Sequence, residues 1–137
     1  MKIKDIMSRD IVTCTPTDLI SEIAQSMRAL DIGCMPVVEG SSVIGMITDR
    51  DIVTRSVAKN GKRLVKDVMS DEVISVGPES TSQEAAEIMA QHRIRRLPVI
   101  KNEQLVGFVA LADLSVPSET AHEASQALHE ISEPRHL

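Results

Sequence analysis

One segment of this chain of 137 residues is repeated. Residues 5–52 align with residues 67–114, a shift of 62 positions, without a gap. Twelve of the 48 aligned positions are identical, and most of the others keep their hydrophobic or polar character. A gapless repeat of this length predicts two copies of one supersecondary unit, which limits the folds open to the chain.

Each copy predicts the element order β-α-β-β-α. The β-branched run 11–14 predicts a short strand, and Asp18 is placed to cap a helix that ends at Gly33. The other elements of the first copy are predicted as strands at 35–38 and 43–47, a hairpin turn at 39–42 and a helix at 49–58. In the second copy Ser80 takes the place of Asp18, with Gln83 as its capping-box partner.

The repeat divides the chain into a first copy at 2–59, a linker at 60–64, a second copy at 65–115 and an acidic C-terminal tail at 116–137. The tail predicts a last helix that begins at Ser118 or Thr120. A narrow hydrophobic seam on this helix predicts packing on the body of the protein or on another subunit: Ala121, Ala124, Leu128 and Ile131.

Composition places the chain among soluble globular proteins, with 42% hydrophobic and 26% charged residues. No hydrophobic run is long enough to span a membrane, and the sequence Met1-Lys2-Ile3-Lys4 is unlike a secretory signal, so a cytoplasmic location is expected. The net charge of −5 and the 1% aromatic content argue against nucleic-acid binding, which needs a basic face and rings for base stacking.

The stretch Gly45-Met46-Ile47-Thr48-Asp49-Arg50-Asp51 joins a strand-like run to a helix-like run. The Thr48 hydroxyl and the Asp51 carboxylate are three residues apart, about one turn at a helix start, so both can face one small ligand. The carboxylate can accept from ribose hydroxyls, while the hydroxyl and the helix start favour an anion. The alternative is structural, with Thr48 or Asp49 serving only as the N-cap of the helix.

The second copy keeps part of this pattern. Its equivalent stretch has the carboxylate Asp113 but carries Ala110 in place of the hydroxyl. Three arginines, Arg93, Arg95 and Arg96, precede its strand, where the first copy has Asp31, Gly33 and Cys34. Arg93 is interpreted as part of a solvated turn. Arg95 and Arg96 are either part of that turn or an anion site, because planar guanidinium groups bind phosphate with two donors.

The two copies, each opening with a Met-Ser pair (Met7-Ser8 and Met69-Ser70) and ending in Gly-hydrophobic-hydrophobic-x-x-x-Asp, resemble the tandem cystathionine-β-synthase (CBS) domain pair, or Bateman module, of the stand-alone bacterial and archaeal type. The resemblance covers residues 2–115. It implies a mixed α/β (α+β) fold of two repeats related by pseudo-two-fold symmetry, with a C-terminal helix added. Gly45 to Asp51 matches the family's adenine-nucleotide signature in full.

The resemblance implies an adenine nucleotide (AMP, ADP or ATP) as a regulatory ligand. Asp51 would hold the ribose hydroxyls, Thr48 would support the ribose or the α-phosphate, and Arg95 and Arg96 would reach the phosphates from the other copy, so the site would be composite. Residues implied around the adenine are Thr13, Cys14, Met35, Pro36 and Val37. The implied binding set is completed by Arg50, Pro98 and Asp113, although Ala110 and the Gly33-Cys34 pair deprive the site at Asp113 of a hydroxyl and a basic partner.

These residues predict a sensor and not an enzyme, because no nucleophile with an adjacent base, catalytic carboxylate pair or metal cluster emerges. The ligand would act by shifting a conformational equilibrium or the affinity for a partner. The resemblance also implies a homodimer, which hydrophobic faces at 49–58 and 111–115 would allow. The regulated protein would be a separate, unidentified chain.

Two other hypotheses follow from the same sequence. The first is a dimeric interaction scaffold with an empty or vestigial nucleotide cleft, whose C-terminal helix recruits the partner. The second is a redox or metal response through Cys14, Cys34 or the tail histidines. Buried free thiols are the preferred interpretation of the cysteines. The histidines recur every seven residues, about 10 Å apart along a helix, which is too far for one metal ion.

Overall fold

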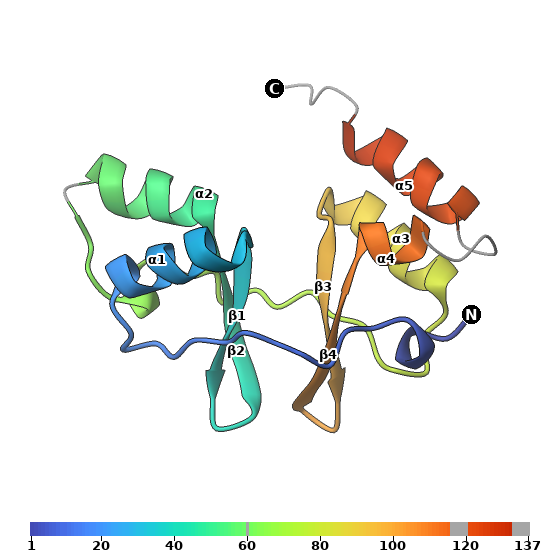
Figure 1. The fold of residues 1–137 in the computed structure, drawn as a ribbon, viewed down its shortest axis with the longest axis horizontal. Coiled ribbons are helices and arrows are strands. Elements are labelled where there is room, and N and C mark those ends of the chain that lie inside the picture. The colour runs from blue at the N-terminus through green and yellow to red at the C-terminus, as the bar shows by residue number, and fades with distance from the viewer. Residues whose placement is uncertain (60, 116–120, 133–137) are drawn as a thin grey trace. The chain divides into compact units, whose positions relative to one another are not determined.

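The computed structural model describes residues 1–59, 61–115 and 121–132, with only the backbone described at 115, 121–124 and 132. The chain combines helices with antiparallel β-hairpins, which confirms the mixed α/β (α+β) class (Figure 1). It divides into two compact units. Unit 1 contains Met1–Ile11 and Ile74–Leu137, and unit 2 contains Val12–Val73.

Unit 2 is built on the hairpin of β1 (Cys34–Glu39) and β2 (Ser42–Thr48), which follows helix α1 (Ile20–Leu30). The remaining helical segments are α2 (Asp49–Asp51), a π-helical turn (Ile52–Ser56) and two 3₁₀ turns (Val57–Lys59 and Val65–Asp67). The predicted helix 49–58 is therefore present, with a changing hydrogen-bond pattern along it. One face of α1 packs into the core of this unit, which consists of Cys14, Ile20, Ile23, Met27, Met35, Val37, Ile47, Ile52, Val65 and Val68.

Unit 1 repeats the plan and adds a helix. A 3₁₀ turn (Ile3–Asp5) is followed by α3 (Ser82–His92), the hairpin of β3 (Arg96–Lys101) and β4 (Gln104–Ala110), α4 (Leu111–Ser115) and α5 (Ala121–Ser132). The core consists of Ile3, Val76, Ala85, Ala86, Met89, Ala90, Leu97, Val99, Val109, Leu111, Leu114 and Ala127. Figure 1 shows α5 lying along α3 and α4, which it contacts.

The lead segment of each sequence copy packs into the core formed with the other copy. Ile3 comes from the first copy but is fully buried in the core of unit 1, and its counterpart Val65 is fully buried in the core of unit 2. The backbone N–H of Ile3 donates to the carbonyl of Ser80 at 2.8 Å, which ties the segment down. The compact units therefore do not follow the copies at 2–59 and 65–115, because burial groups residues that are far apart in sequence.

Each Met-Ser pair crosses a glycine of the hairpin in its unit. In unit 2, Met46 and Ser70 exchange two backbone hydrogen bonds of 2.9 Å across the crossing point. A Cβ atom on the neighbouring Gly45 would lie 2.6 Å from the carbonyl oxygen of Ser70, closer than atoms can approach. The equivalent Gly107 of unit 1 is covered by Met7 and by the Ser8 carbonyl. The glycine of the signature motif is thus required by the backbone crossing.

The predicted strand at 11–14 is wrong except for its last residue. Only Cys14 pairs, in a single parallel bridge with Val37. Its N–H donates to the Pro36 carbonyl at 3.1 Å, and its carbonyl accepts from Val38 at 2.8 Å. The chain turns away immediately afterwards, because the Thr15 N–H donates to the Asp18 side chain at 2.8 Å. A β-branched run favours extended backbone, but a ladder also needs a neighbouring strand.

The predicted N-caps at Asp18 and Ser80 are also wrong, because both side chains close the preceding turn. The Ser80 hydroxyl accepts from the Gly77 N–H at 3.2 Å, as Asp18 does from Thr15. Helix α3 is capped instead by Thr81, whose hydroxyl accepts from the Glu84 N–H at 3.1 Å. The proposed capping-box partner Gln83 has a different role, since its amide donates to Glu87.

Helix α1 lacks the cap that its repeat partner has. Leu19 is its N-cap residue, makes no side-chain capping bond and is 40% exposed. The helix ends at Leu30 with Asp31 in the left-handed conformation (φ 53°), so the predicted end at Gly33 is wrong. The C-cap role falls on an aspartate because Asn and Asp tolerate this conformation better than most residues.

We predict that Leu19→Thr stabilises the protein. The hydroxyl would accept from an N–H of the first turn of α1, as Thr81 does in α3, and a cap of this kind contributes about 1 kcal/mol. Urea denaturation would show a higher midpoint for Leu19→Thr than for the wild type. The converse variant, Thr81→Ala, should lower the midpoint by a similar amount. An unchanged midpoint in both would show that capping does not limit the stability of these helices.

The tail forms the predicted helix but packs with a different residue. Ala127 is 1% exposed and Ile131 packs against the core, whereas Leu128 is 43% exposed, so its predicted place in the seam is wrong. Ala127 faces α3 because a close approach of two helices favours small side chains. Ser118 and Thr120, and the side chains of Ala121 and Ala124, lie outside the described residues.

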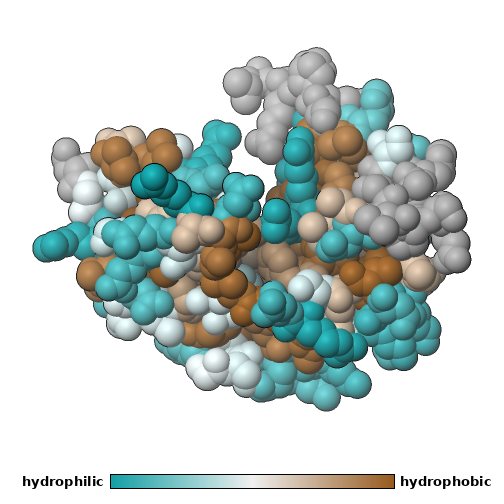
Figure 2. Space-filling model, viewed as in Figure 1, coloured by the Kyte–Doolittle hydropathy of each residue, from teal (hydrophilic) through white to brown (hydrophobic). Residues whose placement is uncertain are grey.

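The covered position of α5 also corrects the expected exposed face at 111–115. Leu111 is 7% exposed and Leu114 is fully buried, since α5 contacts α4. The first copy keeps an exposed face, with Val53 at 59% and Val57 at 72%. Figure 2 shows hydrophobic residues at the surface in the region of α2 and the turn that follows it. Only one of the two expected hydrophobic faces is therefore open to a partner.

Candidate functional site

The end of β2 places Thr48 and Asp51 at the first turn of α2 in a reciprocal arrangement. The Thr48 hydroxyl accepts from the Asp51 N–H at 3.1 Å, and Asp51 Oδ2 accepts from the Thr48 N–H at 3.0 Å. This is a capping box in which both side chains satisfy backbone donors of the helix start. The structural alternative for Thr48, an N-cap, is confirmed. A binding role must therefore use the acceptor capacity that the capping box leaves.

Asp51 retains such capacity. Its side chain is 15% exposed, and its second oxygen, Oδ1, lies 3.8 Å from Nε of Arg55. A carboxylate offers about four lone-pair positions, of which the capping bond uses one. Two ribose hydroxyls could therefore still donate to Asp51 while the cap stays intact. The capping bond also fixes the orientation of the carboxylate before any ligand arrives.

The residues around Thr48 come from the start of β1. Cys34 is paired with Thr48 in the hairpin register, and the Asp49 N–H donates to the Gly33 carbonyl at 2.9 Å. Directly paired residues of an antiparallel hairpin share a face. Met35 and Ile47 belong to the core, so Cys34 and Thr48 lie on the face directed away from it. Thr48, Asp51 and Cys34 thus gather at one end of unit 2.

The side chains predicted around the adenine divide between core and surface. Cys14, Met35 and Val37 are buried in the core of unit 2, so their side chains are committed to packing. Pro36 alternates with them on the opposite face of β1 and is also buried, while Thr13 is exposed. Both backbone polar groups of Cys14 are used by β1. The structure therefore gathers the ribose-binding candidates but leaves few free groups in the predicted adenine wall.

Unit 1 has an end of the same construction with a different chemistry. Asp113 Oδ2 accepts from the Ala110 N–H at 2.7 Å, which is half of the capping box found in unit 2. Arg96 is paired with Ala110 in the hairpin register, and the Arg95 carbonyl accepts from the Leu111 N–H at 2.7 Å. Arg95, Arg96 and Asp113 therefore gather at one end of unit 1, with both arginine side chains exposed.

The expected composite site takes its residues from both units. The structure groups Arg95 and Arg96 with Asp113 in unit 1, whereas Thr48 and Asp51 belong to unit 2. Arg50 is exposed, and its N–H donates to the Asp49 side chain at 2.8 Å. The sharing of one ligand between the two groups stays a prediction.

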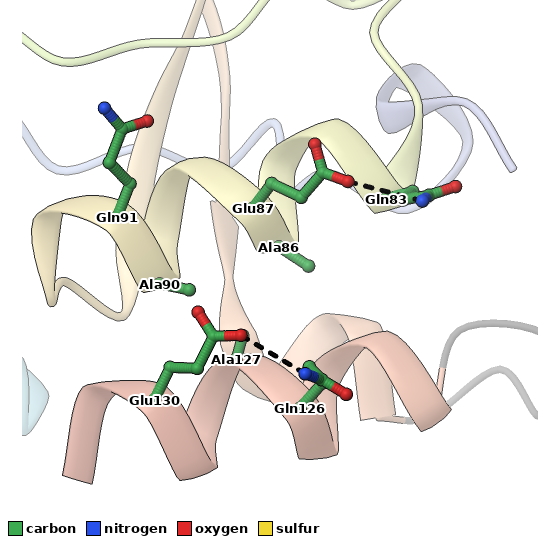
Figure 3. Close-up of a pocket in the computed structure, with 8 residues that line it drawn as sticks. All are labelled: Gln83, Ala86, Glu87, Ala90, Gln91, Gln126, Ala127 and Glu130. Carbon is green, nitrogen blue, oxygen red and sulfur yellow. Dashed lines mark hydrogen bonds between the residues drawn. The ribbon is translucent and has the colours of Figure 1, made fainter. Parts of the chain in front are cut away.

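A pocket that the sequence did not indicate lies between α3 and α5 of unit 1 (Figure 3). Its volume is about 360 Å³. Ala86, Ala90 and Ala127 form the floor, and two Gln-Glu pairs project from the facing helices. Gln83 donates to Glu87 and Gln126 to Glu130, each at 3.3 Å. The i,i+4 spacing of the pairs and of the alanines is visible in the sequence, but the meeting of the two helices is not.

The cysteines do not form a redox pair in this fold. Cys14 is bridged to Val37, three residues and about 10 Å along β1 from Cys34, beyond the reach of a disulfide. Burial, with a smaller contribution from Asp18, raises the pKa of the Cys14 thiol to about 11. A thiol with such a pKa is almost wholly protonated at neutral pH and reacts slowly. Among the described residues no cluster of metal ligands is found.

Comparison with known proteins identifies both copies. The CBS domain model matches residues 3–58 and 65–115. The CBS domain-containing protein YhcV of Bacillus subtilis is 42% identical over 132 residues, covering 95% of this chain and 94% of that protein. Inosine-5'-monophosphate dehydrogenase of Korarchaeum cryptofilum is 41% identical over 107 residues, which span only 22% of that enzyme.

A solved structure extends the comparison to ligands. The CBS domain pair of protein MJ0100, in complex with 5'-methylthioadenosine and S-adenosyl-L-methionine, has a TM-score of 0.76 and 27% sequence identity. The match covers 84% of this chain and 97% of that one. Among the helices that the structure describes, none has the length and hydrophobicity to cross a membrane.

Proposed function

Because this chain belongs to the CBS domain family, we propose that it is a cytosolic regulatory module that binds an adenine nucleotide (AMP, ADP or ATP) and changes its conformation or its affinity for a partner protein. The observation that carries the proposal is the Asp51 carboxylate, oriented by its capping bond and left with an oxygen for ribose hydroxyls. Support comes from MJ0100, whose CBS domain pair binds two adenosine compounds.

The proposed mechanism depends on the position of the site at the junction of a strand and a helix. Thr48 and Asp51 lie where β2 passes into α2, so a ligand held there contacts a strand end and a helix start together. Such a ligand shifts the conformational equilibrium only by the difference in its affinity for the two states. The bound nucleotide would favour the state in which Asp51 and its neighbours form the tighter site. Catalysis is not part of the proposal.

A homodimer is the second element of the proposal. Val53 and Val57 lie four residues apart on one side of the helical segment after α2. Both side chains are mostly exposed, and together they form a hydrophobic stripe of the kind that marks an interaction surface. Pairing with a second copy would bury this stripe. The same stripe favours the alternative function, a dimeric scaffold whose nucleotide site is vestigial. Under both proposals the protein would act on a separate regulated protein.

Nucleotide binding is tested by calorimetry with AMP, ADP and ATP on the wild type and on Asp51→Ala. We expect the variant to lose about 2 kcal/mol or more of binding free energy, at least about thirtyfold in affinity, because charge-assisted bonds to ribose are lost. Since the chain has no Trp or Tyr, absorbance near 260 nm in the purified protein would also report bound nucleotide with little background.

The control for this test is Thr81→Ala, which removes the N-cap of α3 and should cost a similar amount of stability. Equal affinity in Thr81→Ala and the wild type would show that the loss in Asp51→Ala is not a consequence of a general loss of stability. Failure of the wild type to bind any adenine compound would leave the scaffold as the better account.

A further inference from the structure

We propose that an exposed basic patch of unit 2, formed by Lys62, Arg63 and Lys66, binds an acidic segment of a partner protein. A hydrophobic side chain of that segment would pack against Leu19 and Leu64 beside the patch. None of these residues belongs to the predicted nucleotide set. The inference describes the unidentified partner, and it rests on the proposed function for the regulatory role of the contact.

The patch belongs to a stretch of the chain with an uneven distribution of charge. Residues 52–66 carry five basic side chains and no acidic one, whereas the rest of the chain carries 10 basic and 20 acidic side chains. The counterpart of this stretch in the second copy, 114–128, has two acidic residues and neither lysine nor arginine. The positive charge is therefore not a property of the repeat, and it gives unit 2 a local basic surface in an acidic protein.

Backbone hydrogen bonds hold the patch in place. The buried hydroxyl of Ser56 donates to the Lys62 carbonyl at 2.6 Å. The next carbonyl, that of Arg63, accepts from the Ile20 N–H at 2.8 Å. A partner therefore meets cations on a backbone that is already ordered, which lowers the entropic cost of binding.

The equivalent segment of unit 1 shows what its lysines bind. Lys2 and Lys4 donate to the two carboxylate oxygens of Glu79, at 2.8 and 3.2 Å. These bonds hold the pKa of the Glu79 carboxyl below its ordinary value, with the bond from Lys2 contributing most. Because both lysines reach one carboxylate, side chains two residues apart in this segment share one side.

Unit 2 repeats the backbone of this segment. Lys66 is the counterpart of Lys4 in the repeat. The Lys66 N–H donates to the Pro16 carbonyl at 2.9 Å, and the Lys4 N–H donates to the equivalent Pro78 carbonyl at the same distance. Lys66 therefore starts from the position from which Lys4 reaches its carboxylate.

Unit 2 lacks the acid of this arrangement, because Thr17 stands where unit 1 has Glu79. In the part of the chain that the structure describes, no carboxylate lies within 4.0 Å of the charged groups of Lys62, Arg63 or Lys66. All three side chains are exposed. The place that the Glu79 carboxylate fills in unit 1 is therefore open in unit 2 to an acid from another chain.

A hollow beside the patch indicates the kind of partner. Its volume is about 850 Å³, and Leu19 and Leu64 line it together with three cations and one acid, Asp67. Such walls suit a peptide that carries both carboxylates and a hydrophobic side chain, whereas a free phosphate would use the cations alone. A nucleic acid is disfavoured, because the rest of the chain is acidic and offers a single aromatic ring for base stacking.

The patch is tested by fluorescence anisotropy with labelled peptides and the full chain at low salt. The probe is the synthetic peptide Ser-Glu-Glu-Leu-Glu-Glu-Ser, and the comparison peptides carry glutamine for glutamate or serine for leucine. The variant Lys62→Gln/Arg63→Gln/Lys66→Gln removes the patch.

The control variant is Arg9→Gln/Arg28→Gln/Lys101→Gln, which removes three exposed cations outside the patch and has the same net charge. We expect the acidic peptide to bind the patch variant at least tenfold more weakly than the wild type, and the control variant within twofold. The glutamine peptide should bind the wild type at least tenfold more weakly and the serine peptide severalfold more weakly. Higher salt should weaken binding, because the cations are exposed.

Thr17→Glu tests the comparison between the units, with Thr17→Gln as its matched control. The new carboxylate would take the position of Glu79 and pair with Lys66, so the chain itself would occupy the site. We expect affinity for the acidic peptide to fall at least fivefold in Thr17→Glu and to stay within twofold in Thr17→Gln. Unchanged affinity in Thr17→Glu would overturn the assignment of the carboxylate site.

The inference is overturned if the wild type does not bind the acidic peptide, or if the patch variant and the control variant bind it equally. It is also overturned if vesicles of anionic phospholipid or a single-stranded oligonucleotide bind the patch more tightly than the peptide does.

Titration with AMP, ADP and ATP separates this inference from the proposed function. The patch variant should bind the nucleotide with an affinity within twofold of the wild type. A wild type that binds a nucleotide but no acidic peptide would retain the proposed function and refute the patch. A wild type that binds the peptide but no adenine compound would retain the patch as a binding surface and refute the proposed function.

Discussion

Replacement of Gly45 by alanine is expected to destabilise the protein by about 3 kcal/mol or more, the upper end of what overpacking costs. The added methyl group would lie 2.6 Å from the carbonyl oxygen of Ser70, and this oxygen belongs to backbone that pairs with Met46. Neither partner can move without breaking the crossing. Urea denaturation of the variant, followed by circular dichroism, measures the loss.

Two other glycines provide matched comparisons. Alanine at Gly77 would meet its nearest atom, the Ser80 hydroxyl, at 3.7 Å, which is ordinary van der Waals contact, so its cost should be small. Alanine at Gly107 should cost less than at Gly45, because the closest atom belongs to the flexible Met7 side chain. Equal stability of all three variants would show that the Met-Ser segment does not cross the hairpin as described.

Ile3→Ala is expected to destabilise unit 1, although Ile3 belongs to the first sequence copy. Ile3 is fully buried in the core of that unit, and truncation of a buried isoleucine to alanine costs about 2–5 kcal/mol. Hydrogen exchange should therefore accelerate most in β3 and β4. Amide exchange followed by mass spectrometry on proteolytic fragments would locate the effect.

Val65→Ala is the reciprocal variant, since Val65 occupies the same repeat position and is buried in unit 2. Its effect should be smaller, because fewer methyl groups are removed, and should fall on β1 and β2. If each variant instead affected the hairpin of its own sequence copy, the exchange of lead segments between the two cores would be refuted.

Much of the fold could be predicted because it is encoded locally. The hairpins β1–β2 and β3–β4 follow from hydrophobic runs separated by short turns, and the helix after Thr48 follows from a capping pattern that spans four residues. The errors concern choices between neighbouring residues with similar chemistry. Ser80 and Thr81 can both accept a backbone N–H, and only the position of the preceding turn decides which of the two caps α3.

The sequence indicates which residues belong to the candidate site but not how they are arranged in space. Asp51 and Asp113 were recognised from their repeat position, and both carboxylates are held at a helix start. The grouping of Arg95 and Arg96 with Asp113 depends on the register of β3 with β4, which sequence spacing does not report. The pocket between α3 and α5 was missed for the same reason, since two helices must meet to form it.

The sequence by itself determined that this protein has two copies of one unit, two hairpins and a carboxylate after each of them, because repeats, turns and caps involve residues close together in the chain. The tertiary structure alone decided that Ile3 and Val65 each pack into the core formed with the other copy. It also decided that Gly45 is needed for a backbone crossing and that α5 covers α4. These features join segments distant in sequence, and their free energy comes from burial and close packing, which no local pattern records.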